Sequence, residues 1–193
     1  MPYCHELFLS YPNIPLVTDW LDEFLPPFRQ WLRQMLLERR YACPDREDHR
    51  SLIFRDDQIR VGQDWPEVLR RAARDSRCVL AIVLPEYWQS PHCRAEWKTF
   101  TVRGPNLTLP IRFFDSVDEL SGRQFFDLSD HTYLLKGTVP WMEFLKQVKE
   151  LAREVAEAII EAPPYPEGPH PEHWVALEVP EAPLPRHIKQ GRL

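Results

Sequence analysis

Glycine is scarce in this chain, with only six among 193 residues. Neither G-x-G-x-x-G nor G-x-x-x-x-G-K-[ST] occurs, and these are the loops that bind the phosphates of dinucleotides and of nucleoside triphosphates. The G-x-S-x-G elbow that presents a nucleophilic serine is also missing. These absences argue against a hydride-transferring Rossmann enzyme, a P-loop NTPase and a serine hydrolase of the elbow type.

Long apolar runs and paired cysteines are missing as well. No run is long enough to span a bilayer, and the first six residues lack the basic and apolar regions of a secretory signal. The four cysteines include no C-x-x-C pair and suggest no disulfide framework, so we expect a cytoplasmic protein with reduced thiols. Cys4-His5 and His92-Cys93 could in principle hold zinc, but their spacing does not demand it, and we expect neither metal nor cofactor.

The charge balance is mildly acidic, with a formal net charge of -5. Such a chain has no overall attraction for nucleic acid or for an anionic membrane, so we expect neither as a partner. The length suits one domain. Eight prolines fall between Pro163 and Pro185, which predicts a domain over 1–161 and a proline-rich tail or linker over 162–193.

Short apolar segments alternate with helical patterns along the chain. Strands are expected at 6–10, 51–55, 78–84 and 107–114, with a weaker one at 125–128. Helices are expected from Trp20, with a break at Pro26-Pro27, then after Asp64, over 92–102 and over 141–160. This alternation predicts an α/β fold with a flavodoxin-like, doubly wound, mostly parallel five-stranded sheet.

In an open sheet of this kind, ligands bind beyond the carboxyl ends of the strands, where the strand order reverses. An order of 2-1-3-4-5 places that point between the first and third strands, beside the loops at 10–13 and 84–87. Glu96 would then lie one turn into the next helix, facing the crevice or solvent. The alternative is that Glu96 is an ordinary solvated helix residue, as most glutamates are.

Four blocks of sequence occur in a fixed order, namely Leu7–Tyr11, Phe54–Trp65, Ala73–Tyr87 and Ser90–Trp97. Together they resemble the Toll/interleukin-1 receptor (TIR) domain of bacterial type. Leu7–Tyr11 resembles its first strand, and Phe54–Trp65 its second strand with the following BB loop. Ala73–Tyr87 is similar to the third strand, and Ser90–Trp97 to the W-C-x-x-E box. His92 stands where the box usually has tryptophan.

The resemblance covers roughly residues 5–160, about one domain, and implies a TIR fold. Some members of this family cleave the nicotinamide-ribosyl bond of NAD+, and the glutamate of their box, here Glu96, is catalytic. Nicotinamide leaves a cationic ring as a neutral molecule and needs no general acid. One carboxylate can therefore stabilise the oxocarbenium-like centre and hold the ribose hydroxyls. NAD+ would be a substrate, and the product could be ADP-ribose or a cyclic form.

The same resemblance implies roles for other side chains. Ser10 and Tyr11 would form the floor of a substrate pocket, while Arg55 and Asp56 would form its movable wall beside His92. The loop after the second strand would mediate self-association, through Asp57, Ile59, Arg60, Gly62 and Trp65. A homo-oligomer acting in bacterial antiphage defence or cell-death signalling is therefore expected, with a sensor or effector protein as a further partner.

Two alternatives stay open. The chain could be a non-enzymatic adaptor that binds other TIR domains through the loop from Arg55 to Trp65, which the replacement at His92 would favour. It could also be the effector domain of a longer sensor, with the proline-rich segment as the linker.

Overall fold

The structure, a computed structural model, describes residues 3–41, 52–59, 62–115, 120, 122, 124–132 and 138–166. Its strands are β1 (His5–Ser10), β2 (Ile53–Phe54), β3 (Ser76–Val83), β4 (Thr108–Arg112) and β5 (Phe126–Asp127). They lie side by side in the order β2-β1-β3-β4-β5, and every neighbouring pair is parallel. The predicted doubly wound fold and strand order are confirmed, and the sheet described here is wholly parallel.

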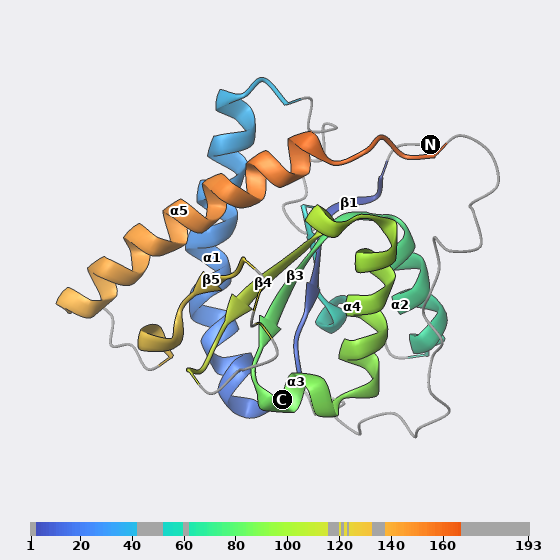
Figure 1. Ribbon diagram of the computed structural model, residues 1–193, viewed down its shortest axis with the longest axis horizontal. Coiled ribbons are helices and arrows are strands. Elements are labelled where there is room, and N and C mark those ends of the chain that lie inside the picture. The colour runs from blue at the N-terminus through green and yellow to red at the C-terminus, as the bar shows by residue number, and fades with distance from the viewer. Residues whose placement is uncertain are drawn as a thin grey trace.

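The described residues form five α-helices, namely α1 (Pro15–Glu38), α2 (Trp65–Arg74), α3 (Pro85–Gln89), α4 (Pro91–Arg103) and, after the last strand, α5 (Val139–Glu161). Figure 1 shows α1 and α5 on one side of the sheet and α2 and α4 on the other. This layering buries every residue of β3 except Arg77, which is half-buried. A strand covered on both faces must be apolar throughout, which explains the unbroken apolar run that predicted it.

Helix α1 differs from the prediction. It begins at Pro15 rather than Trp20, and it continues through Pro26 and Pro27 instead of breaking there. The Thr18 hydroxyl donates to the carbonyl of Ile14 inside the helix and does not cap its start. Each internal proline removes a backbone hydrogen bond and costs about 3 kcal/mol. A buried apolar stripe runs past the prolines and holds the helix together: Val17, Trp20, Leu21, Phe24, Leu25, Phe28, Leu32, Met35 and Leu36.

An aromatic cluster joins α1 to α5 beneath the sheet. The ring of Phe144 is fully buried and its centroid lies 6.2 Å from that of Trp20 and 6.5 Å from that of Phe24. The indole of Trp20 also donates to the carbonyl of His131 at 2.9 Å. This cluster fixes α5 against α1, so the two outer helices form one packed layer.

Other predicted boundaries moved by a few residues. The second strand was predicted over 51–55 but pairs only at Ile53–Phe54, and the fifth pairs only at Phe126–Asp127. The helix predicted after Asp64 is confirmed, with the Asp64 carboxylate accepting from the amide of Glu67. No described helix is long and apolar enough to cross a membrane.

The chain leaves α5 along the edge of the sheet where the strands begin. The Tyr165 hydroxyl donates to Asp75, and the Tyr3 hydroxyl donates to the carbonyl of Pro163. The rings of Tyr3 and Tyr165 meet edge to face, with centroids 5.0 Å apart. Residues 163–166 are therefore held against the domain, and the rest of the expected tail, 167–193, lies outside the described residues.

Candidate functional site

The carboxyl ends of β1 and β3 meet the start of α4 at the predicted reversal of strand order. The Ser90 hydroxyl caps α4 by accepting from the amide of Cys93, and Pro91 occupies the first turn. Glu96 follows on the face of α4 that packs toward the end of β1, where Ser10 is the last strand residue. The predicted placement of Glu96 beside this crevice is confirmed.

Glu96 is buried, with only 6% of its surface exposed. The Ser10 hydroxyl donates to its carboxylate at 2.5 Å, and the same hydroxyl lies 2.8 Å from the phenol of Tyr87. Since Ser10 donates to Glu96, it accepts from Tyr87, and the three groups form a chain of hydrogen bonds across β1, α3 and α4. The interpretation of Glu96 as a solvated helix residue is therefore wrong.

Burial changes the acidity of this carboxyl group. Desolvation is the main cause that raises the pKa of Glu96 to about 8. The hydrogen bond from Ser10 lowers this pKa, and the charge of Asp56 raises it further. A glutamate in this environment is mostly protonated near neutral pH. Carboxyl groups with strongly shifted pKa values that line a crevice are concentrated at functional sites.

Asp56 is a second carboxyl group in the same place. It begins η2 (Asp56–Gln58), directly after β2, and accepts from the Tyr11 phenol at 2.5 Å. Burial raises the pKa of Asp56, and the same cause, followed by the Asp56 charge, raises the pKa of Tyr11. The two carboxyl groups therefore enter the crevice from opposite sides of β1, each bonded to a hydroxyl from the end of that strand.

Arg55 does not face the crevice as a free cation. Its guanidinium donates to Asp22 of α1 at 2.9 Å and to the Tyr11 hydroxyl at 3.2 Å, and it lies 3.3 Å from Asp57. The Arg55 side chain is buried apart from 5% of its surface. Arg55 therefore ties the segment after β2 to α1, and it acts on the crevice through Tyr11.

Two aromatic rings line the crevice. The rings of His92 and Trp65 meet edge to face, with centroids 5.1 Å apart and planes at 88°. Burial lowers the pKa of His92, which favours the neutral imidazole. The cavity left inside is about 60 Å³, and its walls include Tyr11, Asp56, Trp65, His92 and Glu96.

The structure thus brings together most of the residues singled out from the sequence. Ser10, Tyr11, Asp56, His92 and Glu96 surround one crevice. The loop expected to mediate self-association is only partly described. Trp65 lines the crevice and Ile59 is half-buried. Gly62 is exposed with a φ of 91°, and Arg60 lies outside the described residues.

Two contributors were missed in the sequence. Tyr87 lies in the loop that was expected beside the crevice, but nothing in the sequence showed that its phenol would reach Ser10. Asp22 could not be found from pattern, because it lies within a helix that was expected to break four residues later. Both depend on contacts between segments distant in the chain.

Metal ligands do not gather in the part of the chain that the structure describes. It contains no group of three or more histidine, cysteine, aspartate or glutamate side chains placed to hold a metal ion. Cys78 and Cys93 are buried free thiols, and Cys4 is an exposed one, while Cys43 lies outside the described residues. The crevice therefore offers carboxyl, hydroxyl and ring groups as its chemistry.

Comparison with known proteins decides the family. Residues 25–137 match the family model of the TIR domain, and this span is more than half of the chain. The protein belongs to the TIR domain family. None of the curated proteins matches the sequence. The TIR family includes enzymes that hydrolyse NAD+ and signalling adaptors, and its members typically associate through their TIR domains.

The raised pKa of Glu96 gives this TIR domain a predicted pH dependence. Its folded form holds a proton up to about pH 8, whereas a glutamate in the unfolded chain releases it near pH 4.5. The folded state therefore binds more protons between these values, and the free energy of unfolding must fall as the pH rises through that window. Glu96→Gln should remove this fall, so the variant gains stability relative to the parent as pH rises from 5 to 8.

Urea unfolding at several pH values measures the difference between the two proteins. Glu86→Gln is the matched control, because Glu86 is exposed on the neighbouring α3 and should leave the pH dependence unchanged. Parallel stability curves for the parent and Glu96→Gln would show that the Glu96 carboxyl does not titrate as the buried geometry requires.

Proposed function

We propose that this TIR domain cleaves the nicotinamide-ribosyl bond of NAD+, as a hydrolase or cyclase, with Glu96 as the catalytic carboxylate. The observation that supports this most is the burial of Glu96 at the carboxyl ends of β1 and β3, bonded to Ser10 and lying across the crevice from Asp56. Parallel α/β sheets bind their ligands at this location. Isolated carboxyl groups are costly to bury, so their retention here favours a chemical role.

The substrate would enter between the end of β1 and the start of α4. Ser10 and Tyr11 would form the floor of the site, and Asp56, held by Tyr11 and Arg55, would form the wall. The Trp65 and His92 rings would supply the flat surface that the family tryptophan usually supplies. Aromatic faces stack on planar heterocycles, which suits a nicotinamide ring.

Charge explains how a protonated Glu96 becomes active. Nicotinamide in NAD+ carries a positive charge, and a nearby cation favours the ionised form of a carboxyl group. Binding of the substrate should therefore release the Glu96 proton, and the carboxylate would then face the positive charge that develops on the ribose as nicotinamide leaves. This stabilisation is stronger in the transition state than in the bound substrate, which is the condition for catalysis.

The small volume of the crevice supports a site that must open before it can act. Its volume of about 60 Å³ is far below the roughly 300–1,000 Å³ of ordinary ligand pockets. We propose that self-association, through the segment that runs from Asp57 to Trp65, moves the wall and completes the site. Such a cytoplasmic enzyme, silent until it assembles, would suit bacterial antiphage defence or cell-death signalling in response to a sensor protein.

Incubation of the concentrated protein with NAD+, followed by chromatography for nicotinamide, tests the proposal. Release that rises more steeply than the protein concentration is expected, because the active site requires assembly. Absence of release under conditions where light scattering shows oligomers would contradict the enzymatic function.

The alternative, a non-enzymatic adaptor, is favoured by the small volume of the crevice. It predicts that the protein binds other TIR domains without consuming NAD+. Charge reversal by Arg60→Glu should then abolish partner binding in a pull-down assay, while NAD+ remains intact in both the parent and the variant.

A further inference from the structure

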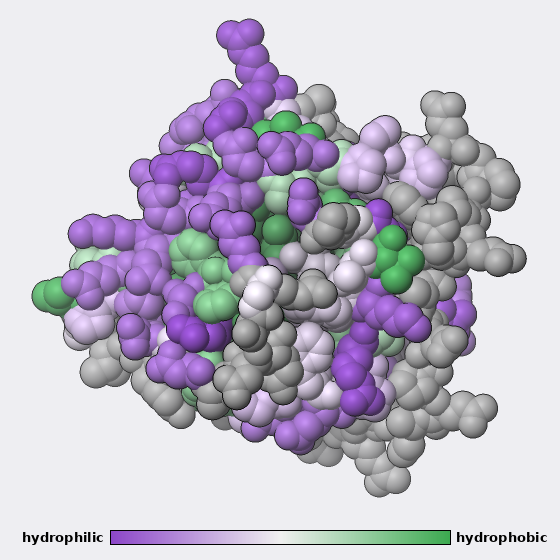
Figure 2. Space-filling model, in the orientation of Figure 1, coloured by the Kyte–Doolittle hydropathy of each residue, from purple (hydrophilic) through white to green (hydrophobic). Residues whose placement is uncertain are grey.

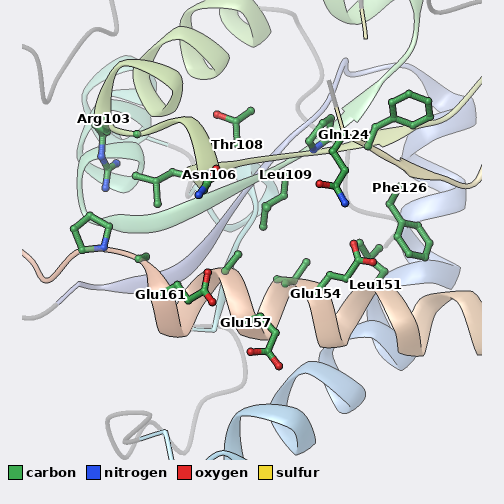
Figure 3. Close-up of a pocket in the computed structure, with 18 residues that line it drawn as sticks. Arg103, Asn106, Thr108, Leu109, Gln124, Phe126, Leu151, Glu154, Glu157 and Glu161 are labelled. Atoms are coloured by element: carbon green, nitrogen blue, oxygen red, sulfur yellow. The ribbon is translucent and has the colours of Figure 1, made fainter. Parts of the chain in front are cut away.

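A groove of about 880 Å³ lies apart from the crevice at Glu96. Helix α5 forms one wall, and β4, β5 and η3 (Pro105–Leu107) form the other. In Figure 3, Glu154, Glu157 and Glu161 lie along α5, and Gln124 and Phe126 lie across from them. The groove contains none of the residues that surround Glu96.

The groove exists because α5 packs chiefly against α1 and β3 and leaves β4 and β5 partly uncovered. Leu109, in the middle of β4, and Phe125 and Phe126, at β5, are therefore only half-buried. Parallel sheets normally have both faces covered. Figure 2 shows apolar surface among hydrophilic side chains over this part of the molecule. The floor of the groove, formed by Leu109, Phe125 and Phe126, would therefore be covered best by an apolar segment.

The negative charges on the rim of the groove favour a basic segment. Glu157 is paired with Arg39, but Glu154 and Glu161 form no ion pair with any described residue. The one cation in the lining, Arg103, directs its guanidinium to the carbonyls of Ala73 and Ser76 at 2.9 and 2.8 Å. The groove thus combines an apolar floor with two carboxylates whose charge is not neutralised.

The same chain contains a segment of matching chemistry. Residues 184–193 read LPRHIKQGRL, with the cations Arg186, Lys189 and Arg192, apolar side chains between them, and no acid. The acidic residues of the preceding stretch all lie before Leu184. The basic and apolar character of 184–193 is complementary to both the rim and the floor of the groove.

The chain between Pro166 and the segment 184–193 is long enough for that segment to reach the groove. Pro163 lines the end of the groove, and Pro166 is the last described residue of the chain. The 17 residues of 167–183 can span at most about 56–61 Å when extended, whereas the α5 wall from Leu151 to Ala162 is about 16 Å long. A tether of this kind gives an effective concentration of roughly millimolar, so even weak complementary contacts are sufficient for binding.

We propose that the groove between α5 and the β4–β5 edge binds the basic segment 184–193 of the same chain. The segment completes the cover of the sheet and neutralises Glu154 and Glu161. This interaction is separate from the crevice at Glu96, so it does not depend on whether the protein cleaves NAD+.

Carbodiimide cross-linking of the full chain tests the proposal, because it joins a lysine amine to a carboxylate only when the two are in contact. The expected product is an amide between Lys189 and Glu154 or Glu161, located by mass spectrometry. A mixture of isotopically heavy and light chains should give this product within single chains. A product found only between heavy and light chains would overturn the proposal in favour of a second copy as occupant.

Charge reversal supplies the second measurement. The double variant Glu154→Lys/Glu161→Lys should accelerate hydrogen exchange of the amides in 108–112 and 124–126 about fivefold, since the segment would no longer cover them. Glu143→Lys is the matched control, because Glu143 is exposed on α5 outside the groove.

The segment itself can also be changed. The double variant Arg186→Glu/Lys189→Glu should accelerate the same amides as much, without altering the groove. Unchanged exchange in this segment variant, together with no Lys189 cross-link in the parent protein, would overturn the proposal.

Discussion

Replacing Glu96 by glutamine should lower nicotinamide release from NAD+ at least about a hundredfold, since removal of a single group that stabilises charge in a transition state typically costs that much. Glutamine keeps the size of the side chain and a carbonyl that can accept from Ser10, whose hydroxyl now lies 2.5 Å from the carboxylate. It cannot supply the negative charge that the developing ribosyl cation requires. The rate of release from equal concentrations of assembled parent and variant measures the effect.

The comparison needs a control for the fold and a control for the charge. Glu86→Gln removes one carboxylate from exposed surface on α3 and should release nicotinamide at the parental rate. Urea unfolding at pH 6 should show that Glu96→Gln is as stable as the parent or more stable, since it removes a buried ionisable group. Equal rates for the parent and Glu96→Gln would exclude Glu96 as the catalytic residue, even if the protein did consume NAD+.

Phe144→Ala should destabilise the fold by about 3–5 kcal/mol, the usual cost of removing a fully buried phenylalanine. Its ring contacts those of Trp20, Phe24, His131 and Trp141, and so joins α5 to α1 and to the segment before α5. No neighbouring side chain can fill the space, because the surrounding rings are themselves packed against one another. The midpoint of urea unfolding, followed by circular dichroism, measures the loss.

Met142→Ala is the matched control for this second prediction. Met142 lies two residues away on the same helix, but 56% of its surface is exposed. Its replacement should change the free energy of unfolding by no more than about 0.5 kcal/mol, as is usual for surface positions. A small effect of Phe144→Ala, similar to that of Met142→Ala, would mean that α5 is not held to α1 by this aromatic cluster.

The sheet was predictable because its signals are local. The run from Cys78 to Leu84 is apolar throughout, short and rich in β-branched residues, which is typical of a strand with both faces covered. The alternation of strands and helices then predicted a doubly wound sheet, and the order 2-1-3-4-5 was a hypothesis within that fold, which the structure confirms. Pairing over two residues, as at Ile53–Phe54, leaves too weak a pattern to define the ends of a strand.

The continuity of α1 could not be predicted in this way. Pro26 and Pro27 each carry a strong local signal for a break, and the interactions that overcome it come from α5 and from Phe113 after β4, far along the chain. The same limit applied to the crevice. Its position followed from the topology, and Glu96 from the family resemblance, but the bond from Tyr87 to Ser10 and the anchor between Arg55 and Asp22 depend on tertiary packing.

The two prolines inside α1 also have a consequence for how the protein folds. A helix normally grows from one nucleus by adding a hydrogen bond with each residue, and two adjacent residues without amide hydrogens interrupt that growth. The segments before Pro26 and after Pro27 must therefore nucleate separately, and neither is long enough to be stable alone. We expect α1 to become a single rod only when Phe24 and Phe28 find the surface of the sheet and α5, so that the first helix of the chain is among the last to form.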